Sequence, residues 1–400
     1  MTSFTTNTTN AFNSDSSMDI VCFSHLRWNF VYQRPQHLMS RFARQNRVFL
    51  IEEPYLNAEQ TDYIELIKKG NVTIAIPHLQ HGLSDKDIIF RQVKLLKELF
   101  EEESVNNYLF WYYTPMAAAI GNHFYPAFIL YDCMDELSNF KFAPPELKER
   151  EKELFSKADL VFTGGHNLYN AKKDYHHNIH SFPSSIDKEH FTQARDVANE
   201  PEGQKNIPHP RLGFYGVVDE RFDIDLITEV AERKPEWQFV IIGPVIKIDP
   251  ESLPHLNNIH YLGSKTYDEL PQYLAGWDIA LIPFLRNEST KYISPTKTPE
   301  YLAGGKPVIS TSIIDVVTPY GINNLVHIAD TPDEFIKAAD FELNNTDRNQ
   351  WLQNVDLFLS QNSWDKTWNR MMQLITDTMK KKIKVGVNNI ISNLNTEVYV

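Results

Sequence analysis

Cysteine is scarce in this sequence. Only Cys22 and Cys133 occur among its 400 residues, and each lies within an apolar run. Two such residues cannot build a disulfide framework or a cysteine-based zinc site, so we expect reduced, buried thiols and a cytoplasmic location. Apolar stretches are also short, because none reaches the roughly 20 residues that a membrane-spanning helix needs. Residues 1–17 are rich in Ser, Thr and Asn and lack the pattern of a signal peptide, so we expect a disordered leader there.

Positive charge is in the minority. Lys and Arg number 39 and Asp and Glu number 52, so the formal net charge is −13 and the pI is near 5.5. Nucleic acid is therefore not expected as the main partner, since its phosphates are bound by clustered basic residues. Two features still predict peripheral contact with a membrane: a helical pattern over residues 85–104 and a group of arginines, Arg27, Arg34, Arg41, Arg44 and Arg47. The alternative for the helix is that it simply covers a sheet.

The dinucleotide fingerprint Gly-x-Gly-x-x-Gly is absent as well. Residues 19–24 form a short apolar run that predicts a first strand, but residues 25–37 follow it without a single glycine. A strand–helix–strand unit is therefore expected without the nucleotide glycines, which argues against a dehydrogenase.

What the sequence does contain predicts two domains. A 400-residue chain with 42% hydrophobic content exceeds the usual size of one core. Strand and helix patterns alternate in both halves, so the expected fold class is α/β with two Rossmann-like domains and parallel sheets. Ligands of such sheets bind at the carboxyl ends of the strands, in the cleft between the domains. We expect domains at 18–195 and 211–350, a linker at 196–210, closing helices at 351–384, in which Trp351, Trp364 and Trp368 pack against a domain, and a tail at 385–400.

Residues 294–311 form the segment with the clearest ligand-binding pattern. Ser294 and Pro295 are typical of a helix start, where unpaired backbone N–H groups and the helix dipole attract an anion. Lys297 adds a cation, and Glu300 lies one turn further on, where it can accept hydrogen bonds from sugar hydroxyls. Pro299 leaves a second interpretation open, in which the regular helix begins at 298–299 and the preceding residues are a loop.

The second half of the chain resembles the nucleotide-sugar half of GT-B glycosyltransferases, especially the retaining family 4. The matching segments occur in the family's order at 213–216, 240–243, 258–263, 270–278, 282–284 and 294–311. In the first half, segments 28–38, 131–135 and 181–187 are similar to a bacterial subgroup associated with extracellular or cell-wall polysaccharide. The resemblance covers roughly residues 19–380. It implies a GT-B fold, with two parallel sheets that face each other across a cleft.

For the donor, the resemblance implies that Glu300 holds the ribose and that the backbone of Ser294, Pro295 and Thr296, together with Lys297, faces the diphosphate. Gly216 would allow close approach of the donor, and Arg221 matches the family's phosphate-binding cation. The second cation of that loop is missing, so Lys297, Arg286 or Lys291 are the substitutes. A family glutamate that contacts the transferred sugar, seven residues before Glu300, is replaced by Tyr292, which either takes over the contact or leaves it to loop backbone groups.

For the acceptor, the resemblance points to the first domain. Asp132 stands near the place of the family's acceptor-side histidine, and we predict that it polarises the acceptor hydroxyl, with Asp135 beside it. Turn formation by these aspartates is the alternative. Trp28 can stack on a sugar and arginine can pair with an anionic group, so the predicted acceptor channel also contains residues that follow the first strand: His25, Arg27, Trp28 and Arg34. The predicted catalytic residues are Asp132, Arg221, Lys297 and Glu300.

The chemistry implied by the resemblance is metal-independent glycosyl transfer with retention. Cations and helix-terminal N–H groups stabilise the leaving diphosphate. We expect no cofactor and no metal: Asp223 and Asp225 are interpreted as a helix start, His176 and His177 as a loop, and His37 as a packing residue. The predicted function is transfer of a sugar from a nucleotide-sugar to a glycan or lipid-linked acceptor. The alternatives are a nucleotide-sugar 2-epimerase and a catalytically silent nucleotide- or glycan-binding subunit.

Overall fold

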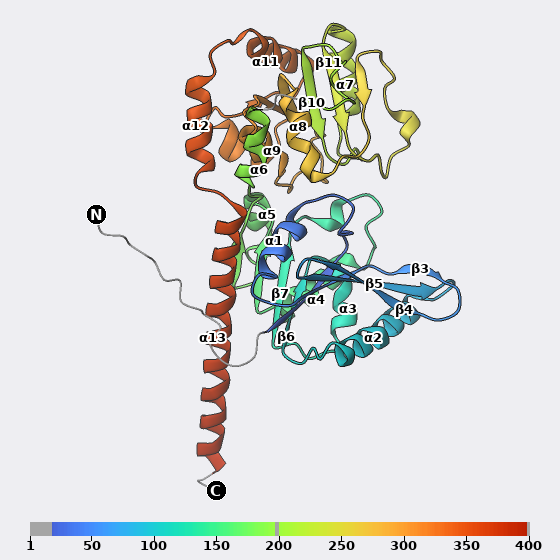
Figure 1. Cartoon of the computed structure of the whole chain (residues 1–400). Coiled ribbons are helices and arrows are strands. Elements are labelled where there is room, and N and C mark those ends of the chain that lie inside the picture. The colour runs from blue at the N-terminus through green and yellow to red at the C-terminus, as the bar shows by residue number, and fades with distance from the viewer. Residues whose placement is uncertain (1–17, 197–199, 398–400) are drawn as a thin grey trace, which may run out of the picture.

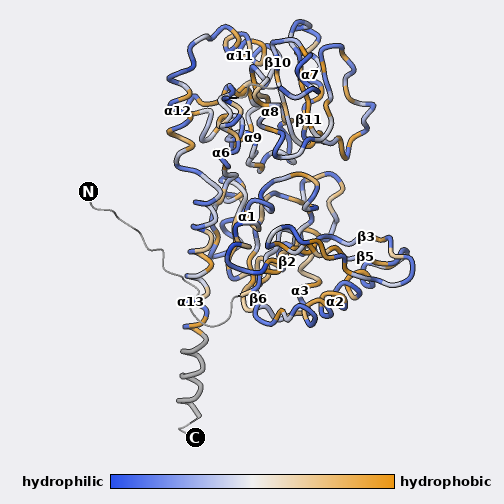
Figure 2. Tube along the Cα trace, in the orientation of Figure 1, coloured by the Kyte–Doolittle hydropathy of each residue, from blue (hydrophilic) through white to orange (hydrophobic). Residues whose placement is uncertain are grey.

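The computed structural model describes residues 18–196 and 200–397, with side chains placed up to residue 385. The expected leader at 1–17 lies outside the described residues. Two α/β domains follow each other along the chain, and a long final helix returns from the second domain to the first (Figure 1). Figure 2 shows hydrophobic residues concentrated on the strands inside both domains, while most connecting loops are hydrophilic.

The N-terminal domain contains a nine-stranded sheet in the order β3-β5-β2-β1-β6-β7-β8-β9, with β4 antiparallel to β5 and all other pairs parallel. The alternation of strands and helices in this half is therefore confirmed, whereas β3, β4 and β9 were not predicted. The strands are β1 Asp19–Ser24, β2 Val48–Glu52, β3 Tyr55–Ala58, β4 Tyr63–Lys69, β5 Val72–Gln80, β6 Tyr108–Tyr112, β7 Phe128–Cys133, β8 Leu160–Thr163 and β9 Ile179–Ser181.

Helices cover both faces of this sheet, because successive side chains of a strand point to opposite faces. Ile20 and Cys22 of β1 pack with α1 and the final helix, whereas Val21 and Phe23 pack with α2 to α5. The helix expected at 85–104 is α2, and its Leu96 and Leu99 are buried against the sheet, as the sheet-covering alternative predicts. The helices of this domain are α1 Arg34–Phe42, α2 Asp85–Glu102, α3 Ala118–Gly121, α4 Leu147–Lys157 and α5 His166–Lys172. The next helix, α6 Lys188–Thr192, packs with its Phe191 into the core of the C-terminal domain.

The C-terminal domain contains a six-stranded parallel sheet in the order β12-β11-β10-β13-β14-β15. Its strands are β10 Arg211–Tyr215, β11 Gln238–Ile242, β12 Ile259–Tyr261, β13 Ile279–Ile282, β14 Val308–Ser310 and β15 His327–Ile328. Its helices are α7 Ile224–Arg233, α8 Leu270–Ala275, α9 Lys297–Ala303, α10 Ile314–Val316, α11 Pro332–Asn344 and α12 Asn349–Leu359.

The end of the chain differs from the expected division into closing helices and a tail. The helix α13, Trp364–Glu397, continues through residue 385 without a break. Val355 of α12 belongs to the core of the C-terminal domain, whereas Trp364 and Trp368 of α13 pack into the N-terminal domain. The chain thus crosses back between the two helices, at residues 360–363. Within the described residues, no helix combines the length and the apolar character that crossing a membrane requires.

The arginine group near the N-terminus is engaged in ion pairs inside the molecule. Arg41 and Arg44 both contact Asp365 of α13, at 3.1 and 2.6 Å, and so attach this helix to α1. The other three pair with Glu52, Asp132 and Asp19. The arginines therefore do not form a free cationic surface for anionic lipid, and membrane contact stays a prediction without their support.

Candidate functional site

The strongest candidate site lies where β10 ends and α9 begins. β10 is a strand of the parallel sheet of the C-terminal domain, and α9 packs against the strands β13 and β14 of the same sheet. The residue after β10 and the first turn of α9 therefore meet at the sheet edge that carries ligands in such folds. Lys297 and Glu300 are three residues apart on α9 and share one face of its first turn. The predicted juxtaposition of a cation and a carboxylate is therefore present.

Glu300 is held as a hydrogen-bond acceptor. Its side chain is buried, and the Tyr215 hydroxyl at the end of β10 donates to its Oε2 at 2.8 Å. Burial raises the pKa of Glu300, while the Tyr215 hydrogen bond and the neighbouring Lys297 lower it. Burial also raises the pKa of Tyr215, which keeps the phenol protonated as a donor. The Tyr301 hydroxyl accepts the backbone N–H of Tyr215 at 3.0 Å, which fixes this strand end against α9.

Lys297 is a half-buried cation with another cation near it. Burial lowers the pKa of Lys297, and the positive charge of Arg221 lowers it further, whereas Glu300 and Asp219 raise it. Its ammonium lies 5.5 and 5.6 Å from the ring centres of Phe214 and Phe284. An additional anion, such as a phosphate, would favour the charged form of this amine. The arrangement is suited to binding an anion beside a hydroxyl-bearing group.

Gly216 provides the space in which Lys297 lies. A Cβ atom at this position would approach the Lys297 Cε and Nζ atoms to 2.3 and 2.6 Å. The backbone φ of Gly216 is +142°, a conformation that residues with a side chain rarely adopt. A residue larger than glycine would therefore displace the ammonium.

Comparison of Gly216→Ala with a control substitution distinguishes the steric contact with Lys297 from the backbone strain of a positive φ. We expect Gly216→Ala to cost about 1–2 kcal/mol of stability through its positive φ and to weaken nucleotide binding about tenfold, because Lys297 has to move. Gly82→Ala is the matched control, since Gly82 also has a positive φ but no atom lies within 4 Å of its added Cβ. Thermal unfolding and titration with UDP measure the two effects. Equal nucleotide affinities in the two variants would contradict the proposed role of the space at Gly216.

Arg221 connects the two domains. It forms a bidentate ion pair with Asp219, with distances of 2.9 Å from Nε to Oδ1 and 2.7 Å from Nη2 to Oδ2. Its guanidinium lies 5.4 Å from the ring centre of Phe140, an N-terminal-domain residue that packs against the core of the other domain. Burial raises the pKa of Asp135 to about 6, while the positive charges of Arg221 and Arg34 lower it. Asp135 therefore interacts with both guanidinium groups. The structure thus brings Arg221, Lys297 and the predicted acceptor-side Asp135 together.

The structure places Ser294 outside the helix, which agrees with the second interpretation, a loop before a helix start near 298–299, to within two residues. The helix α9 begins at Lys297, and Thr296 occupies the N-cap position without a side-chain cap bond. Ser294 instead contacts the other domain: its Oγ accepts the Ser184 N–H at 3.3 Å, and its carbonyl accepts the Ser184 hydroxyl at 2.5 Å. The carbonyl oxygens of Pro295 and Thr296 accept N–H groups of the first turn. Residues 294–296 are therefore a loop that joins the domains.

The candidates for a second cation and for the sugar contact separate in space. Arg286 pairs with Asp330 at 3.2 Å and Lys291 lies 3.4 Å from Glu288, so of the three proposed substitutes only Lys297 lies beside Arg221. Tyr292 packs against the core of the N-terminal domain, where Phe155 also lies. The structure therefore assigns Tyr292 a contact between the domains and does not place it beside Glu300.

On the acceptor side, the structure gives Asp132 a partner within the protein, so its contact with an acceptor stays a prediction. Its side chain is 0% exposed and forms an ion pair with Arg34, whose Nη2 lies 2.8 Å from Asp132 Oδ1. Arg34 Nη1 also donates to the Phe182 carbonyl at 2.8 Å. Both carboxylate oxygens of Asp132 accept from Arg34, so Asp132 fixes Arg34 and, through the bond to Phe182, the segment after β9.

The other predicted acceptor residues follow β1. Burial and the charge of Lys247 in the opposite domain lower the pKa of His25 to about 4, so this histidine is neutral near pH 7, and its buried Nδ1 has no protein partner. Arg27 Nη1 and the Trp28 backbone N–H both donate to Glu52, at 3.0 and 2.7 Å. His25 thus faces the second domain, whereas Arg27 and Trp28 are anchored to the end of β2.

Several predictions about other residues are confirmed, and some site residues were missed. Asp223 caps α7 by accepting the Leu226 N–H at 3.0 Å, and His37 stacks on Trp364 at 4.5 Å. The absence of a metal stays a prediction; across the described ranges, no group of three or more His, Cys, Asp or Glu residues is arranged to hold a metal ion. Tyr215, Asp219, Lys247 and Phe140 were not predicted. Only Tyr215 left a usable signal, since it precedes Gly216 at the end of a predicted strand.

Comparison with known families and proteins agrees with this geometry. Residues 209–345 match the family described as glycosyl transferases group 1. The chain is also 24% identical over 221 residues to the putative teichuronic acid biosynthesis glycosyltransferase TuaH of Bacillus subtilis (strain 168), an alignment that covers 51% of this chain. The chain spans about half the length of this curated relative, 55%.

Solved structures share the fold at low sequence identity. Sucrose-phosphate synthase from Thermosynechococcus elongatus superposes with a TM-score of 0.67 at 14% identity, over 91% of this chain and 100% of that one. Anabaena HepE in complex with UDP and glucose superposes with a TM-score of 0.64 at 12% identity, over 90% of this chain and 99% of that one. The catalytic domain of starch synthase IV from Arabidopsis thaliana bound to ADP and acarbose gives 0.64 at 12%, over 91% and 100%.

Proposed function

Because the chain has the GT-B fold and residues 209–345 form a group 1 glycosyl transferase domain, we propose that it transfers a sugar from a nucleotide-sugar donor to a glycan or lipid-linked acceptor. The observation that carries the proposal is the pairing of Lys297 and Glu300 on one turn of α9, beside Gly216 and Arg221. We assign the chain to the retaining family 4 type on the resemblance of its segments. The TuaH relative favours a role in surface polysaccharide synthesis.

Each residue of the site has a role in this reaction. The Glu300 carboxylate accepts hydrogen bonds from the ribose hydroxyls, with Tyr215 fixing its orientation. The Lys297 ammonium and the Arg221 guanidinium bind the diphosphate, which gains negative charge as the bond to the anomeric carbon breaks. The acceptor hydroxyl then attacks on the same face, and its proton passes to the leaving phosphate. These residues supply the required positive charge, so we propose a transfer without a metal ion or cofactor.

The acceptor hydroxyl is expected beside Asp135 and His25, because both lie at the carboxyl edge of the N-terminal sheet and interact with charges of the opposite domain. A neutral His25 can accept a hydrogen bond from that hydroxyl at its unpartnered Nδ1. The reaction is proposed to take place in the cytoplasm, in keeping with two free, buried cysteines.

A ligand screen followed by a turnover assay tests the proposal. Thermal unfolding is measured with UDP, GDP, ADP, CMP and their sugars, because a ligand that binds only the folded state raises the melting temperature. For the donor that stabilises the protein, Glu300→Ala should weaken binding about 10- to 100-fold. This loss of affinity corresponds to the free energy of hydrogen bonds to a charged group. Glu288→Ala is the control, since that carboxylate is exposed and lies outside the site.

The products distinguish the alternatives. Sugar transfer or slow donor hydrolysis that depends on Glu300 supports the glycosyltransferase, whereas conversion of the donor to its 2-epimer without an acceptor supports an epimerase. Binding without turnover across the whole panel supports a silent binding subunit. The proposal fails if no nucleotide-sugar binds or reacts and the Glu300 variant behaves as the parent protein does.

A further inference from the structure

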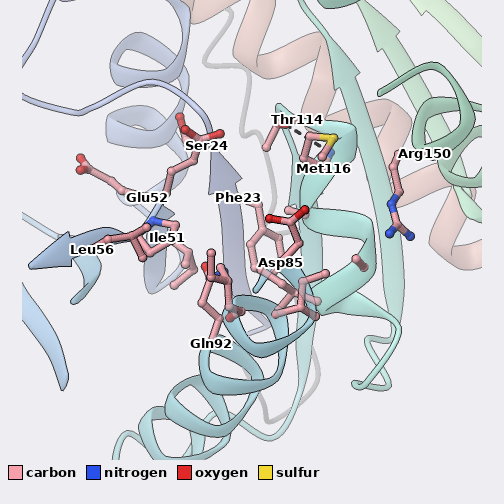
Figure 3. A pocket seen from close by; sticks show the side chains of 17 residues that line it. Phe23, Ser24, Ile51, Glu52, Leu56, Asp85, Gln92, Thr114, Met116 and Arg150 are labelled. Carbon is pink, nitrogen blue, oxygen red and sulfur yellow. Dashed lines mark hydrogen bonds between the residues drawn. The ribbon is translucent and has the colours of Figure 1, made fainter. Parts of the chain in front are cut away.

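A cavity of about 310 Å³ lies in the N-terminal domain, outside the donor site. It is bounded by the carboxyl ends of β1 and β2, by the segment after β6 and by the first half of α2 (Figure 3). This volume is at the lower end of the range of small-molecule pockets, roughly 300–1,000 Å³. The cavity is thus large enough for part of a ligand.

The wall of the cavity is mainly apolar. Phe23 and Ile51 come from the central strands, and both are almost fully buried. Ile88 and Ile89 of α2 and Ile120 of α3 line it from the helical side. Figure 3 shows Phe23 near the centre of the view, with Ile51 and Leu56 on one side and Arg150 on the other. Such a wall favours an apolar occupant, because burial of apolar surface is favourable and non-directional.

The buried polar groups of the wall are already bonded within the protein. The Ser24 hydroxyl donates to the Leu26 carbonyl at 2.9 Å, and Gln92 Nε2 donates to the Ile88 carbonyl at 3.3 Å. Thr114 Oγ1 accepts the Met116 N–H at 3.3 Å, and the carboxylate of Glu52 receives bonds from Arg27 and Trp28. A sugar in this cavity would have to compete for these bonds, whereas a hydrocarbon chain would not.

The position of the cavity links it to the proposed acceptor site. Ser24 immediately precedes His25, the residue whose pKa is affected by Lys247 of the opposite domain. Glu52, a wall residue, anchors Arg27 and Trp28, so the loop after β1 adjoins the cavity. Leu56, also in the wall, is 39% exposed, which leaves an apolar connection to solvent. The loop that carries His25 and an apolar opening at Leu56 therefore both border this cavity.

We propose that this cavity binds the apolar chain of an amphiphilic acceptor whose polar head lies in the cleft beside His25. The inference rests on the proposed function and narrows its acceptor to an alcohol or glycan attached to a hydrocarbon chain. The hydrocarbon chain of the acceptor contributes affinity through its burial against α2 and α3, and the polar head presents its hydroxyl to the donor sugar.

Two matched probes test the inference. Binding of n-octyl β-D-glucoside, below its micelle concentration, and of methyl β-D-glucoside to the full chain is measured by saturation-transfer NMR titration. We expect the octyl compound to bind at least tenfold more tightly. Ile89→Glu, which places a charge in the cavity, and Ile120→Trp, which fills it, should each reduce octyl glucoside binding at least tenfold. Ile322→Glu is the control, because Ile322 is 64% exposed in the other domain.

The outcomes separate this inference from the proposed function. Equal binding of the two glucosides, no binding of the octyl compound, or octyl binding that neither cavity variant reduces would overturn the inference. UDP binding is measured on the same samples and should remain unchanged in all three variants. If octyl glucoside binds as expected but no nucleotide or nucleotide-sugar does, the cavity assignment is supported and the glycosyltransferase proposal is the part that fails.

Discussion

Replacement of Lys297 by methionine is expected to lower turnover of the nucleotide-sugar donor about 100- to 1000-fold. The side chains are similar in length, but methionine carries no charge to stabilise the leaving diphosphate, and the loss of one preorganised electrostatic contact has an effect of this size. The half-buried position of Lys297 increases the effect, because a charge interaction is stronger where water is partly excluded. Steady-state kinetics with the donor identified in the thermal screen measure kcat and KM for both proteins.

A pH profile shows whether the charge of Lys297 is responsible. Burial and Arg221 lower the pKa of this amine, so its positive charge is present at low pH and is lost as the pH rises through the lowered pKa. The activity of the parent protein should therefore fall at a lower alkaline pH than the pKa of an ordinary lysine predicts. The pH profile of Lys297→Met should lack this alkaline decrease. Lys291→Met is the control, since Lys291 is an exposed cation of the same segment. An equal loss of activity in the two variants would contradict the role assigned to Lys297.

Sequence patterns were sufficient for the architecture because buried parallel strands are continuous apolar runs. The runs at β1, β2, β6 and β10 are buried along their whole lengths, and such runs are the basis of the predicted alternation of strands and helices. The strand β4, Tyr63–Lys69, has no buried residue, and β3 is mostly exposed, so neither has the apolar pattern that identifies a strand. The end of the final helix was missed because residues 385–397 contain Gly386 and four asparagines, which are poor helix formers, although Val387, Ile390, Ile391 and Leu394 stand at helical spacing.

The candidate site was predictable where its geometry is local. Lys297 and Glu300 lie on one turn whether the helix begins at residue 294 or at 297, so the error in the helix start did not separate them. Asp132 and Arg34 are 98 positions apart, and only the folded packing of β7 against α1 shows that they neutralise each other. The same holds for Asp135 and Arg221, which come from different domains. Long-range charge pairs are therefore the part of the site that composition and spacing did not determine.

Contacts of loop residues also hold the two domains in a fixed position relative to each other. Asp315 of the C-terminal domain accepts the N–H groups of His166 and Asn167, at 2.9 and 3.0 Å, at the start of α5. Ser184 and Ser294 form a second connection beside α9. Both connections adjoin the site, so the position of α9 depends on the first domain. Residues that were predicted as ligand contacts, Ser294 and Tyr292, instead contribute to this junction.

The buried pair of Arg34 and Asp132 leads to the largest expected effect on stability. Asp132→Asn keeps the shape of the side chain but leaves the Arg34 guanidinium buried without its counter-charge. Removal of one partner of such a pair typically costs about 3–5 kcal/mol of unfolding free energy. Urea unfolding of the full chain, followed by far-UV circular dichroism, measures this change. Glu229→Gln is the control, because its exposed pair with Arg233 contributes at most about 1 kcal/mol.

The same variant decides between the two roles considered for Asp132. If this carboxylate positions Arg34, Asp132→Asn lowers stability, UDP binding in the other domain stays unchanged at temperatures where the protein is folded, and Arg34→Leu combined with Asp132→Leu recovers part of the lost free energy because no buried charge remains unpaired. If Asp132 contacted the acceptor, sugar transfer would fall while stability and donor hydrolysis stayed near the parent values. Its fully buried side chain and bidentate partner favour the first outcome, since an acceptor could reach this carboxylate only after the ion pair had opened.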